Sequence, residues 1–382
     1  MDEGRDRDRF RGCLIGGAIG DALGYTVEFL SASEIRERFG ESGITEYELV
    51  DGVAQISDDT QMTLFTANGL LLGTTRGKTR GIMGSYWNYV GCCYKDWLRT
   101  QSKKLLAEAD YNYSWLVNVP ELHNNRAPGK TCLTVIHSGV FGTIEDPIND
   151  SKGCGVVMRV APVGLYFSRM DREGVAMIGA ETAALTHGHD LGYIPAAALA
   201  YIINSILYFD YEGEDDLKTI VFDCLDCMDE FFTDKPHIQD FRELIENAID
   251  LAERGKPHEK CIRELGEGWV AEETLAIAIF CALRYKHDFE KAICAAVNHG
   301  GDSDSTGSVT GNILGAYHGY DALPQKYTES LELKDIILEV ADDLWADCRI
   351  DEYSASEDGV WEHKYIYNDY KPHGRTTGGT LE

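Results

Sequence analysis

The sequence is short of positive charge. Its 382 residues include 35 Lys and Arg against 64 Asp and Glu, which gives a formal net charge of −29 at pH 7. This charge would repel a nucleic-acid backbone or an anionic membrane, so we expect neither as the main partner. A basic protein partner or bound metal cations remain compatible with it. Simple solubility accounts for most of the charge.

Two kinds of hydrophobic segment are also missing. The N-terminus, from Met1 to Arg9, is charged and lacks the apolar core of a secretory signal. The longest mostly apolar run, from Ile194 to Phe209, is interrupted by Asn204 and Ser205. It falls short of the roughly 20 residues of a membrane span, so it is typical of a buried helix. Eleven cysteines without a signal indicate reduced thiols, and we expect a cytoplasmic protein.

The cysteines do not form a recognisable zinc site. Cys224 and Cys227 make one C-x-x-C pair, but no second pair or histidine set accompanies it. Cys281, Cys294 and Cys348 lie in apolar helical patterns, where cysteine behaves as a small hydrophobic residue. We therefore expect packing roles for most cysteines.

Convincing strand alternation is scarce, whereas helical periodicity recurs. It predicts helices near residues 172–185, 191–209, 215–232, 238–254, 271–286, 288–298 and 331–348, and an aromatic-rich helical region from Gly77 to Gln101. No linker or internal repeat interrupts the chain, so we expect a single all-α domain over residues 1–350. Residues 351–382 form a polar extension whose last ten residues are predicted to be disordered.

The stretch from His299 to Gly319 is rich in oxygen-bearing side chains at its start. Asp302, Asp304 and Ser305 follow two glycines, and glycines recur at 307, 311, 315 and 319. This pattern predicts a tight turn that delivers carboxylates and a hydroxyl to the start of a closely packed helix. Such oxygen ligands suit Mg²⁺ or Ca²⁺. Asp and Ser also favour helix starts as ordinary caps, so this segment alone leaves both interpretations open.

A second acidic segment, Ser57-Asp58-Asp59, heads another predicted helix. Acidic residues at a helix start complement the helix dipole. Two adjacent carboxylates nevertheless repel each other, and capping needs only one. A bound cation explains both, which makes this segment the natural partner of the Asp302 segment.

The first predicted helix is rich in glycine, and a single glutamate follows it. Glycines at 12, 16, 17, 20 and 24 are costly inside a helix, so they indicate close backbone approach to neighbouring helices or to a ligand. Glu28 lies between Val27 and Phe29. A carboxylate with apolar neighbours is a candidate for a raised pKa or a catalytic role, although a lone glutamate is often merely exposed.

Two glycine-containing loops precede helices and could hold phosphate on their backbone N–H groups. The first, Gly129-Lys130-Thr131, lacks the preceding glycine spacing of a P-loop. The second runs from Lys152 to Pro162. In Thr186-His187-Gly188-His189, at the end of a predicted helix, each histidine fits a helix C-cap better than a catalyst.

Four of these segments occur in an order found in a known family. They are Gly16 to Gly24 with Glu28-Phe29, then Ser57 to Thr60, then Gly153-x-Gly155-x-x-Met158-Arg159-x-Ala161-Pro162, then Gly300 to Ser305. Together they resemble the ADP-ribosylglycohydrolase family, which includes the dinitrogenase reductase-activating glycohydrolase and the ADP-ribosyl-acceptor hydrolases. The resemblance spans roughly residues 9 to 348. It implies an orthogonal multi-helix all-α bundle with two divalent metal ions, Mg²⁺ or Mn²⁺, at the floor of an ADP-ribose cleft.

Matching positions carry the family's site residues over to this chain. The implied metal ligands are Ser57, Asp58, Asp59, Asp302, Asp304 and Ser305. Family members often have threonine at the two serine positions, and serine keeps the hydroxyl. The resemblance also implies that Gly155, Val156 and Met158 line the pyrophosphate and ribose, and that His187 neighbours the distal part of the ligand. The loop Gly129-Lys130-Thr131 completes the predicted substrate-binding set.

Glu28 matches the catalytic glutamate of the eukaryotic serine-directed branch. In the nitrogenase-reactivating branch an aspartate lies just ahead of a Gly-x-Thr segment, where this chain has Ala127 and Pro128. This departure leaves Glu28 or a metal-bound water for the acid–base step.

The resemblance implies a metal-dependent hydrolase, expected as a monomer, that removes ADP-ribose from a modified protein side chain, arginine-type first, or from a small acceptor. Two alternatives stay open. One is a catalytically silent ADP-ribose binder, because the family includes a lens crystallin. The other is a hydrolase of a free ADP-ribose derivative or another nucleoside diphosphate. The presence of all six ligand positions and Glu28 argues against a silent relative.

Overall fold

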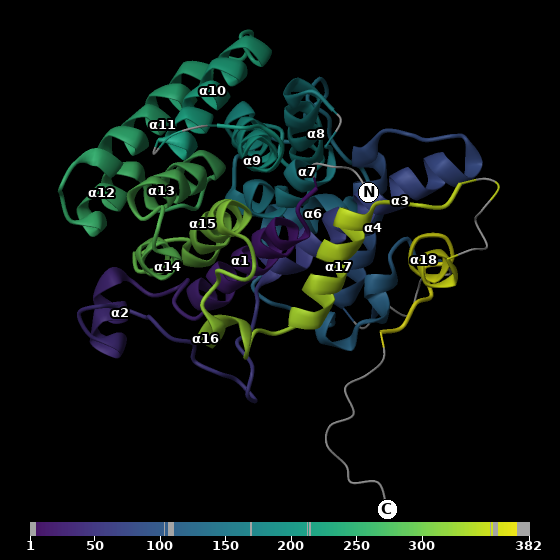
Figure 1. Cartoon of the computed structure of the whole chain (residues 1–382), viewed down its shortest axis with the longest axis horizontal. Coiled ribbons are helices and arrows are strands. Elements are labelled where there is room, and N and C mark those ends of the chain that lie inside the picture. Colours follow the sequence, from purple (N-terminus) through teal and green to yellow (C-terminus); the bar gives the residue numbers. More distant parts are fainter. Residues whose placement is uncertain are drawn as a thin grey trace, which may run out of the picture.

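The computed structural model describes residues 5–102, 104–105, 111–168, 170–211, 213, 215–351, 353 and 358–372. Within these residues every regular element is a helix, and β-structure is limited to three isolated bridges. The predicted all-α class is therefore confirmed. Figure 1 shows the helices packed at many different angles around α1 and α15 rather than as one parallel bundle.

The helices follow the chain in this order: α1 (Arg7–Tyr25), α2 (Ala32–Phe39), α3 (Asp58–Arg80), α4 (Tyr86–Thr100), the 3₁₀ helices η1 (Trp115–Asn118) and η2 (Pro120–Leu122), α6 (Lys130–Ser138), the 3₁₀ helix η3 (Cys154–Arg159), α7 (Ala161–Tyr166), α8 (Arg172–Ala184), α9 (Asp190–Tyr208), α10 (Asp216–Phe231), α11 (Ile238–Glu253), α12 (His258–Leu265), α13 (Ala271–Arg284), α14 (Phe289–Val297), α15 (Ser303–His318), α16 (Gln325–Thr328), α17 (Lys334–Ala346) and α18 (Gly359–Tyr365).

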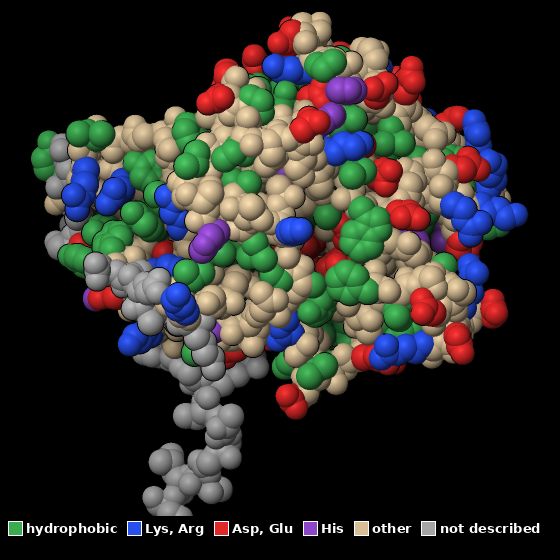
Figure 2. All heavy atoms as spheres, turned by 180° about the vertical axis from the view of Figure 1, so that it is seen from behind, with side chains coloured by type: hydrophobic (Ala, Val, Ile, Leu, Met, Phe, Trp, Pro, Cys, Tyr) green, Lys and Arg blue, Asp and Glu red, His purple; other side chains and the backbone are tan. Residues whose placement is uncertain are grey.

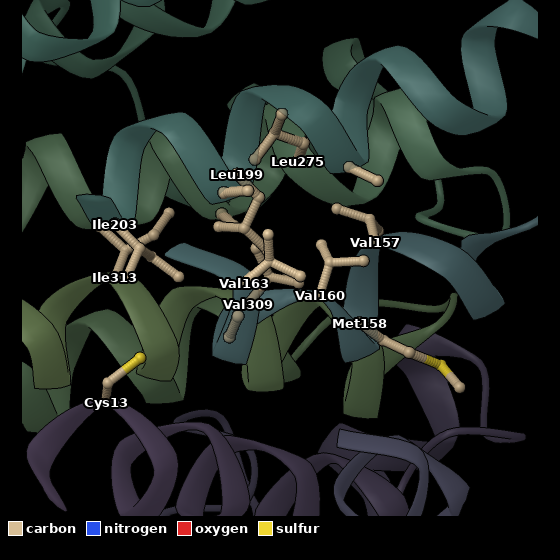
Figure 3. Close-up of a cluster of buried hydrophobic side chains, with 14 of the residues drawn as sticks. Cys13, Val157, Met158, Val160, Val163, Leu199, Ile203, Leu275, Val309 and Ile313 are labelled. Carbon is tan, nitrogen blue, oxygen red and sulfur yellow. The ribbon is translucent and has the colours of Figure 1, made fainter. Parts of the chain in front are cut away.

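Helix α9 runs through the hydrophobic core. It packs against α7, α8, α10 and α13, and among the described helices it is the one long and apolar enough to cross a membrane. Most of its residues are buried inside the protein, which confirms the prediction of a buried helix. Figure 3 shows Leu199 and Ile203 of α9 facing Val163 of α7 and Val309 and Ile313 of α15.

Helices α1 and α15 form a glycine seam that organises the centre of the molecule. Gly12, Gly16, Gly20 and Gly24 of α1 lie against the main chain of Gly315, Gly311, Gly307 and Ser303 respectively. A Cβ atom at any of the four α1 positions would overlap a main-chain carbonyl of the opposite segment. The two helices therefore run antiparallel at close range. The close backbone approach predicted from the glycine spacing is confirmed.

Most of the region from Gly77 to Gln101 is helical as predicted, but it is divided between the end of α3 and the separate helix α4. Helix α3 ends at Arg80 because Gly81 adopts a left-handed conformation, with φ of 66°, and its N–H donates to the Gly77 carbonyl. Such a glycine commonly terminates a helix. Helix α4 starts afresh at Tyr86.

The described part of the C-terminal extension packs on α3, η1 and α17, far from the start of α3. The indole Nε1 of Trp361 donates to Thr75 Oγ1 at 3.0 Å, and Lys364 Nζ pairs with Asp343 at 2.6 Å. Thr75 lies 17 residues after Asp58, which is about 25 Å along a helix. The ten residues predicted to be disordered, 373–382, lie outside the described residues.

Candidate metal and active site

Three segments far apart in the chain bring six carboxyl groups together. Asp21 lies on α1 and Glu28 in the turn after it, Asp58 and Asp59 begin α3, and Asp302 and Asp304 lie at the start of α15. All six side chains are buried, with at most 7% of the residue surface exposed. We call this group the acidic cluster. It contains Glu28 and every aspartate that the sequence assigned to metal binding.

The start of α3 is held by Asp21 rather than by its own aspartates. Asp21 accepts hydrogen bonds from the Ser57 N–H at 2.9 Å, and from the N–H and Oγ1 of Thr60 at 3.1 and 2.5 Å. Ser57 caps the helix through its Oγ, which accepts from the Asp59 N–H at 3.2 Å. The side chains of Asp58 and Asp59 are therefore not needed as caps. Sequence reasoning missed Asp21, although a carboxylate inside an apolar, glycine-rich helix was a usable signal.

The start of α15 likewise leaves its first carboxylate unused as a cap. Asp302 stands at the N-cap position but accepts no capping hydrogen bond through its side chain. Its backbone is fixed instead, because the Asp302 N–H donates to the Glu267 carbonyl at 2.8 Å. Asp304 Oδ1 accepts from the Ser305 N–H at 3.0 Å. A simple capped helix does not explain why Asp302 is buried here.

No cationic side chain among the described residues pairs with the acidic cluster. Among the described residues, none of its six carboxyl groups takes part in an ion pair. Glu28 Oε2, Asp59 Oδ2 and Asp302 Oδ2 are buried without any hydrogen-bond partner. One carboxylate oxygen from each of Glu28, Asp302 and Asp304 lies within 4.8 Å of the other two. Burial of unpaired carboxylates is costly, and an all-oxygen donor set fits hard divalent cations.

The electrostatics reflect this crowding. Burial, followed by the charges of Asp304 and Asp302, raises the pKa of Glu28 to about 10. Burial and the nearby Asp304 raise the pKa of Asp21 to about 7, although its hydrogen bonds from Thr60 and Ser57 act in the opposite direction. The pKa values of Asp58, Asp59 and Asp302 are also raised, first by burial and then by Asp304. A bound cation would oppose all of these shifts.

Several predicted substrate residues border this cluster. Ser305 Oγ lies 3.9 Å from the Met158 sulfur, and the Gly129 N–H donates to Asp58 Oδ2 at 3.2 Å. Met158 lies at the edge of the hydrophobic core, with its side chain directed away from the other labelled residues (Figure 3). Thr131 Oγ1 is 3.3 Å from Ser151 Oγ, and Lys130 is exposed. The structure therefore brings the 129 loop and η3 beside the predicted metal ligands.

The remaining predicted residues are Gly155 and Val156 on η3, and His187, which lies beside Gly155. A Cβ atom at Gly155 would come within 3.8 Å of the His187 ring, whereas the Val156 side chain is fully buried. His187 Nδ1 bonds Thr186 Oγ1 at 2.8 Å, and burial together with Arg159 lowers the His187 pKa to about 3. The C-cap interpretation is wrong for His189. Its side chain instead accepts from the Leu191 N–H and caps the start of α9.

Two buried arginines that the sequence did not single out support the surrounding loops. Arg159 is fully buried, with its guanidinium 4.5 Å from the centre of the Tyr94 ring and 2.8 Å from Thr186 Oγ1. Arg126 pairs with Glu332 at 3.1 Å, and its carbonyl accepts from the Asp58 N–H at 3.1 Å. Both form contacts that link distant segments, which local sequence patterns do not predict.

An exposed aromatic pair lies beside the acidic cluster. Phe29, directly after Glu28, is 70% exposed, and its ring stacks on Trp269 with centroids 6.3 Å apart. Gly268, next to Trp269, lies against Asp302, because a Cβ atom added to it would be 3.4 Å from the Asp302 Cβ. Figure 2 shows, on one face of the molecule, recessed acidic atoms bordered by hydrophobic side chains.

A separate surface pocket of about 400 Å³ lies between α10, α11 and the turn after α13. Its lining includes Lys218, Arg284, Lys286 and Lys291 together with Asp215, Glu253 and Asp288. None of its lining residues belongs to the acidic cluster. The two features are therefore distinct.

A family model for ADP-ribosylglycohydrolases matches residues 2–353. The chain belongs to the ADP-ribosylglycohydrolase family. Enzymes of this family hydrolyse glycosidic bonds. The match covers all segments that form the acidic cluster, so the predicted resemblance is confirmed.

Similar proteins span nearly the whole chain. An uncharacterized protein of Archaeoglobus fulgidus is 28% identical over 348 residues, covering 88% of this chain and 96% of its own. Human ADP-ribosylhydrolase ARH3 is 25% identical, and the match covers 86% of this chain and 90% of the human protein. The ADP-ribosyl-[dinitrogen reductase] glycohydrolase of Rhodospirillum rubrum is 23% identical, and the match covers 86% of this chain and 91% of that protein.

A solved structure described as an ADP-ribosylglycohydrolase-related protein complex has the same fold. Its TM-score is 0.56 at 24% identity, and the match covers 89% of this chain and 98% of that one. The helical architecture is thus shared with that structure over almost its entire length.

Proposed function

We propose that this protein is a metal-dependent hydrolase that cleaves the bond between C1 of ribose and an acceptor, releasing ADP-ribose. The acceptor of first choice is an arginine-type side chain of a modified protein. The observation that carries the proposal is the acidic cluster, whose buried carboxyl groups have no cationic partner in the described part of a chain that belongs to the ADP-ribosylglycohydrolase family. The serine-directed and small-acceptor linkages are tested alongside the arginine linkage.

Two divalent cations, Mg²⁺ or Mn²⁺, fit the donor set. Ser57, Asp58 and Asp59 would hold them from α3, and Asp302, Asp304 and Ser305 from α15. The four aspartates among these residues supply four negative charges, which balance two divalent ions. When bound, the ions orient vicinal ribose hydroxyls and polarise a water molecule. Asp21 keeps α3 in place through its bonds to Ser57 and Thr60.

Glu28 is the chain's own candidate for proton transfer. Cleavage breaks the C1–acceptor bond, leaves oxocarbenium-like charge on C1 and requires a proton on the departing acceptor atom. A water oxygen then bonds to C1 and gives up a proton. Glu28 Oε2 has no hydrogen-bond partner among the residues that the structure describes, so it is free to exchange a proton at this position. Its raised pKa means that it holds a proton at neutral pH while no cation is near.

Phe29 and Trp269 would contact the substrate beside the reacting bond. Both rings are exposed and lie next to residues of the acidic cluster. Aromatic faces attract a guanidinium group through cation–π interactions, which fits an arginine-type acceptor. They also accept a flat base by stacking, so this pair does not by itself distinguish the acceptor from the adenine.

The deciding experiment is a panel of linkages. The protein is incubated with ADP-ribosylarginine, ADP-ribosylserine and O-acetyl-ADP-ribose, each with Mg²⁺ and with EDTA, and released ADP-ribose is measured. We expect release from ADP-ribosylarginine that depends on Mg²⁺. Release that persists in EDTA would contradict the role of the metal ions. Release from O-acetyl-ADP-ribose alone would favour a hydrolase of free derivatives, and no release from any substrate would favour a silent ADP-ribose binder.

A further inference from the structure

A second group of potential metal ligands lies outside the acidic cluster. His189 and Asp190 stand at the start of α9, and His237 stands at the N-cap position of α11. One ligand atom from each of the three residues lies within 4.8 Å of the other two. Neither α9 nor α11 carries a residue of the acidic cluster. The group is partly accessible, with side-chain exposures of 17% for His189, 6% for Asp190 and 39% for His237.

The contacts within this group converge on one carboxylate oxygen. Both His189 Nδ1 and His237 Nδ1 lie 2.8 Å from the same oxygen, Asp190 Oδ1. His189 Nδ1 accepts a hydrogen bond from the Leu191 N–H at 3.0 Å, so it carries no proton of its own. The same N–H also donates to Asp190 Oδ1 at 2.8 Å, so His189 Nδ1 and Asp190 Oδ1 share one hydrogen. A cation bound by His189 Nδ1 and Asp190 Oδ1 would take the place of this N–H as their common partner.

We propose that His189, Asp190 and His237 bind a transition-metal ion, with Zn²⁺ as the ion best suited to them. Two imidazoles and one carboxylate form a mixed nitrogen and oxygen donor set, which suits Zn²⁺ rather than Mg²⁺. Tetrahedral Zn²⁺ ligands at about 2.0–2.2 Å from the ion lie roughly 3.3–3.6 Å from each other, so the two 2.8 Å contacts would lengthen by about half an ångström or more on binding. The exposure of His237 leaves room for a water as the fourth ligand.

The chain around this site is positioned by other contacts. The His237 N–H donates to Asp190 Oδ2 at 3.0 Å, and the His189 N–H donates to the Ser151 carbonyl at 3.3 Å. The two imidazole rings face each other with centroids 4.8 Å apart and an angle of 31° between their planes. An ion here would tie the start of α9 to the start of α11, which are connected through a long stretch of chain. Its binding would stabilise the folded protein by mass action.

The experiment uses the full chain with excess Mg²⁺, which competes with Zn²⁺ for any oxygen-only site that remains. Zn²⁺ binding is measured by calorimetry, and the melting temperature is followed with and without Zn²⁺. The background is Asp302→Asn with Asp304→Asn, so that Zn²⁺ cannot bind at the acidic cluster. We expect one equivalent of Zn²⁺ to bind and to raise the melting temperature. Binding of Co²⁺ in its place should give the visible absorption of a site with nitrogen ligands.

Matched variants separate this site from incidental binding. His189→Gln and His237→Gln should each weaken Zn²⁺ binding by at least about tenfold, and the double variant should abolish both binding and the thermal shift. His258→Gln is the control, because His258 lies on α12 and bonds Tyr285 Oη at 3.0 Å. It should bind Zn²⁺ as the parent does. Unchanged Zn²⁺ affinity in the double variant would overturn the proposal, as would an absence of Zn²⁺ binding in the parent.

Discussion

Gly20 of α1 and Gly307 of α15 lie backbone against backbone, and a Cβ atom added to either would overlap the main chain of the other. Asp21 directly follows Gly20, and Asp304 lies about one helical turn before Gly307. The glycine seam therefore places two buried carboxyl groups on opposite sides of one contact. Burial is the largest cause of the raised pKa values of Asp21, Glu28 and Asp58, and the nearby Asp304 charge raises each of them further.

The seam predicts a large loss of stability for Gly16→Ala. Its new methyl group would overlap the Gly311 carbonyl, which belongs to a helix backbone and cannot rotate away. We expect the free energy of unfolding to fall by about 3 kcal/mol or more, measured by urea denaturation. Gly255→Ala is the control, since a Cβ atom there meets nothing within 4 Å and its φ is not positive. Equal urea midpoints for the two variants would contradict the seam.

Asp302→Asn tests the assignment of metal ligands. It should reduce turnover far more than stability, and it should reduce the rise in melting temperature that Mg²⁺ produces. Without metal the variant should melt at or above the wild-type temperature, because it removes one charge from a crowded cluster. Glu41→Gln, at an exposed position, serves as the control. If Mg²⁺ raised the melting temperature of Asp302→Asn as much as that of the wild type, Asp302 would not be a ligand.

Glu28→Gln tests the proton-transfer role. The amide keeps the size of the side chain but cannot give up or take a proton at this position. We expect ADP-ribose to bind with little change while kcat falls by about 100-fold or more, as is usual for loss of a general acid or base. Binding is measured by calorimetry and kcat with the responsive substrate of the linkage panel. An unchanged kcat would remove Glu28 as the acid–base group.

Trp269→Ala tests the aromatic pair. The indole is 40% exposed and stacks on Phe29, so its removal takes away contact area without opening the core. We expect KM to rise with a smaller change in kcat, because the ring would bind ground state and transition state alike. Trp269→Phe should recover most of the affinity. If KM is the same in wild type and Trp269→Ala, the aromatic pair does not touch the substrate.

The buried imidazole of His299 should make the free energy of unfolding depend on pH. Burial lowers the pKa of His299 to about 4, whereas an unfolded histidine titrates near 6.5. Between these values the unfolded chain binds more protons, so the folded state loses stability as the pH falls through this window. Between pH 7 and pH 4.5 the loss from this residue should be about 2 kcal/mol.

The matched variant is His299→Gln, measured by urea unfolding at both pH values in EDTA. Its amide can still donate to Thr306 Oγ1, the partner of His299 Nε2 at 2.9 Å. Titration of the acidic cluster is common to both proteins and cancels in the comparison. Stability curves that run parallel from pH 7 to pH 4.5 would contradict a neutral, buried His299.

Local spacing was enough to predict the helices and much of the acidic cluster. Glycines four residues apart lie on one face of a helix, so a close backbone approach at that face of α1 followed from their positions, whereas its partner α15 did not. The pairs Asp58-Asp59 and Asp302-x-Asp304 each contain more carboxylates than the capping of one helix requires. The boundary at Gly81 was harder to predict, because helical periodicity continues on both sides of a single left-handed residue.

Contacts between distant segments were decided only by the tertiary structure. Asp21 is a carboxylate within an apolar helix in the sequence, and only the packing of α1 on α3 shows that it holds Ser57 and Thr60. Likewise, the sequence treated His189 as a cap of the preceding helix, while folding sets it against His237 from α11. Sequence periodicity specifies which face of each helix is buried. The partner of that face depends on packing among many helices, which no local pattern encodes.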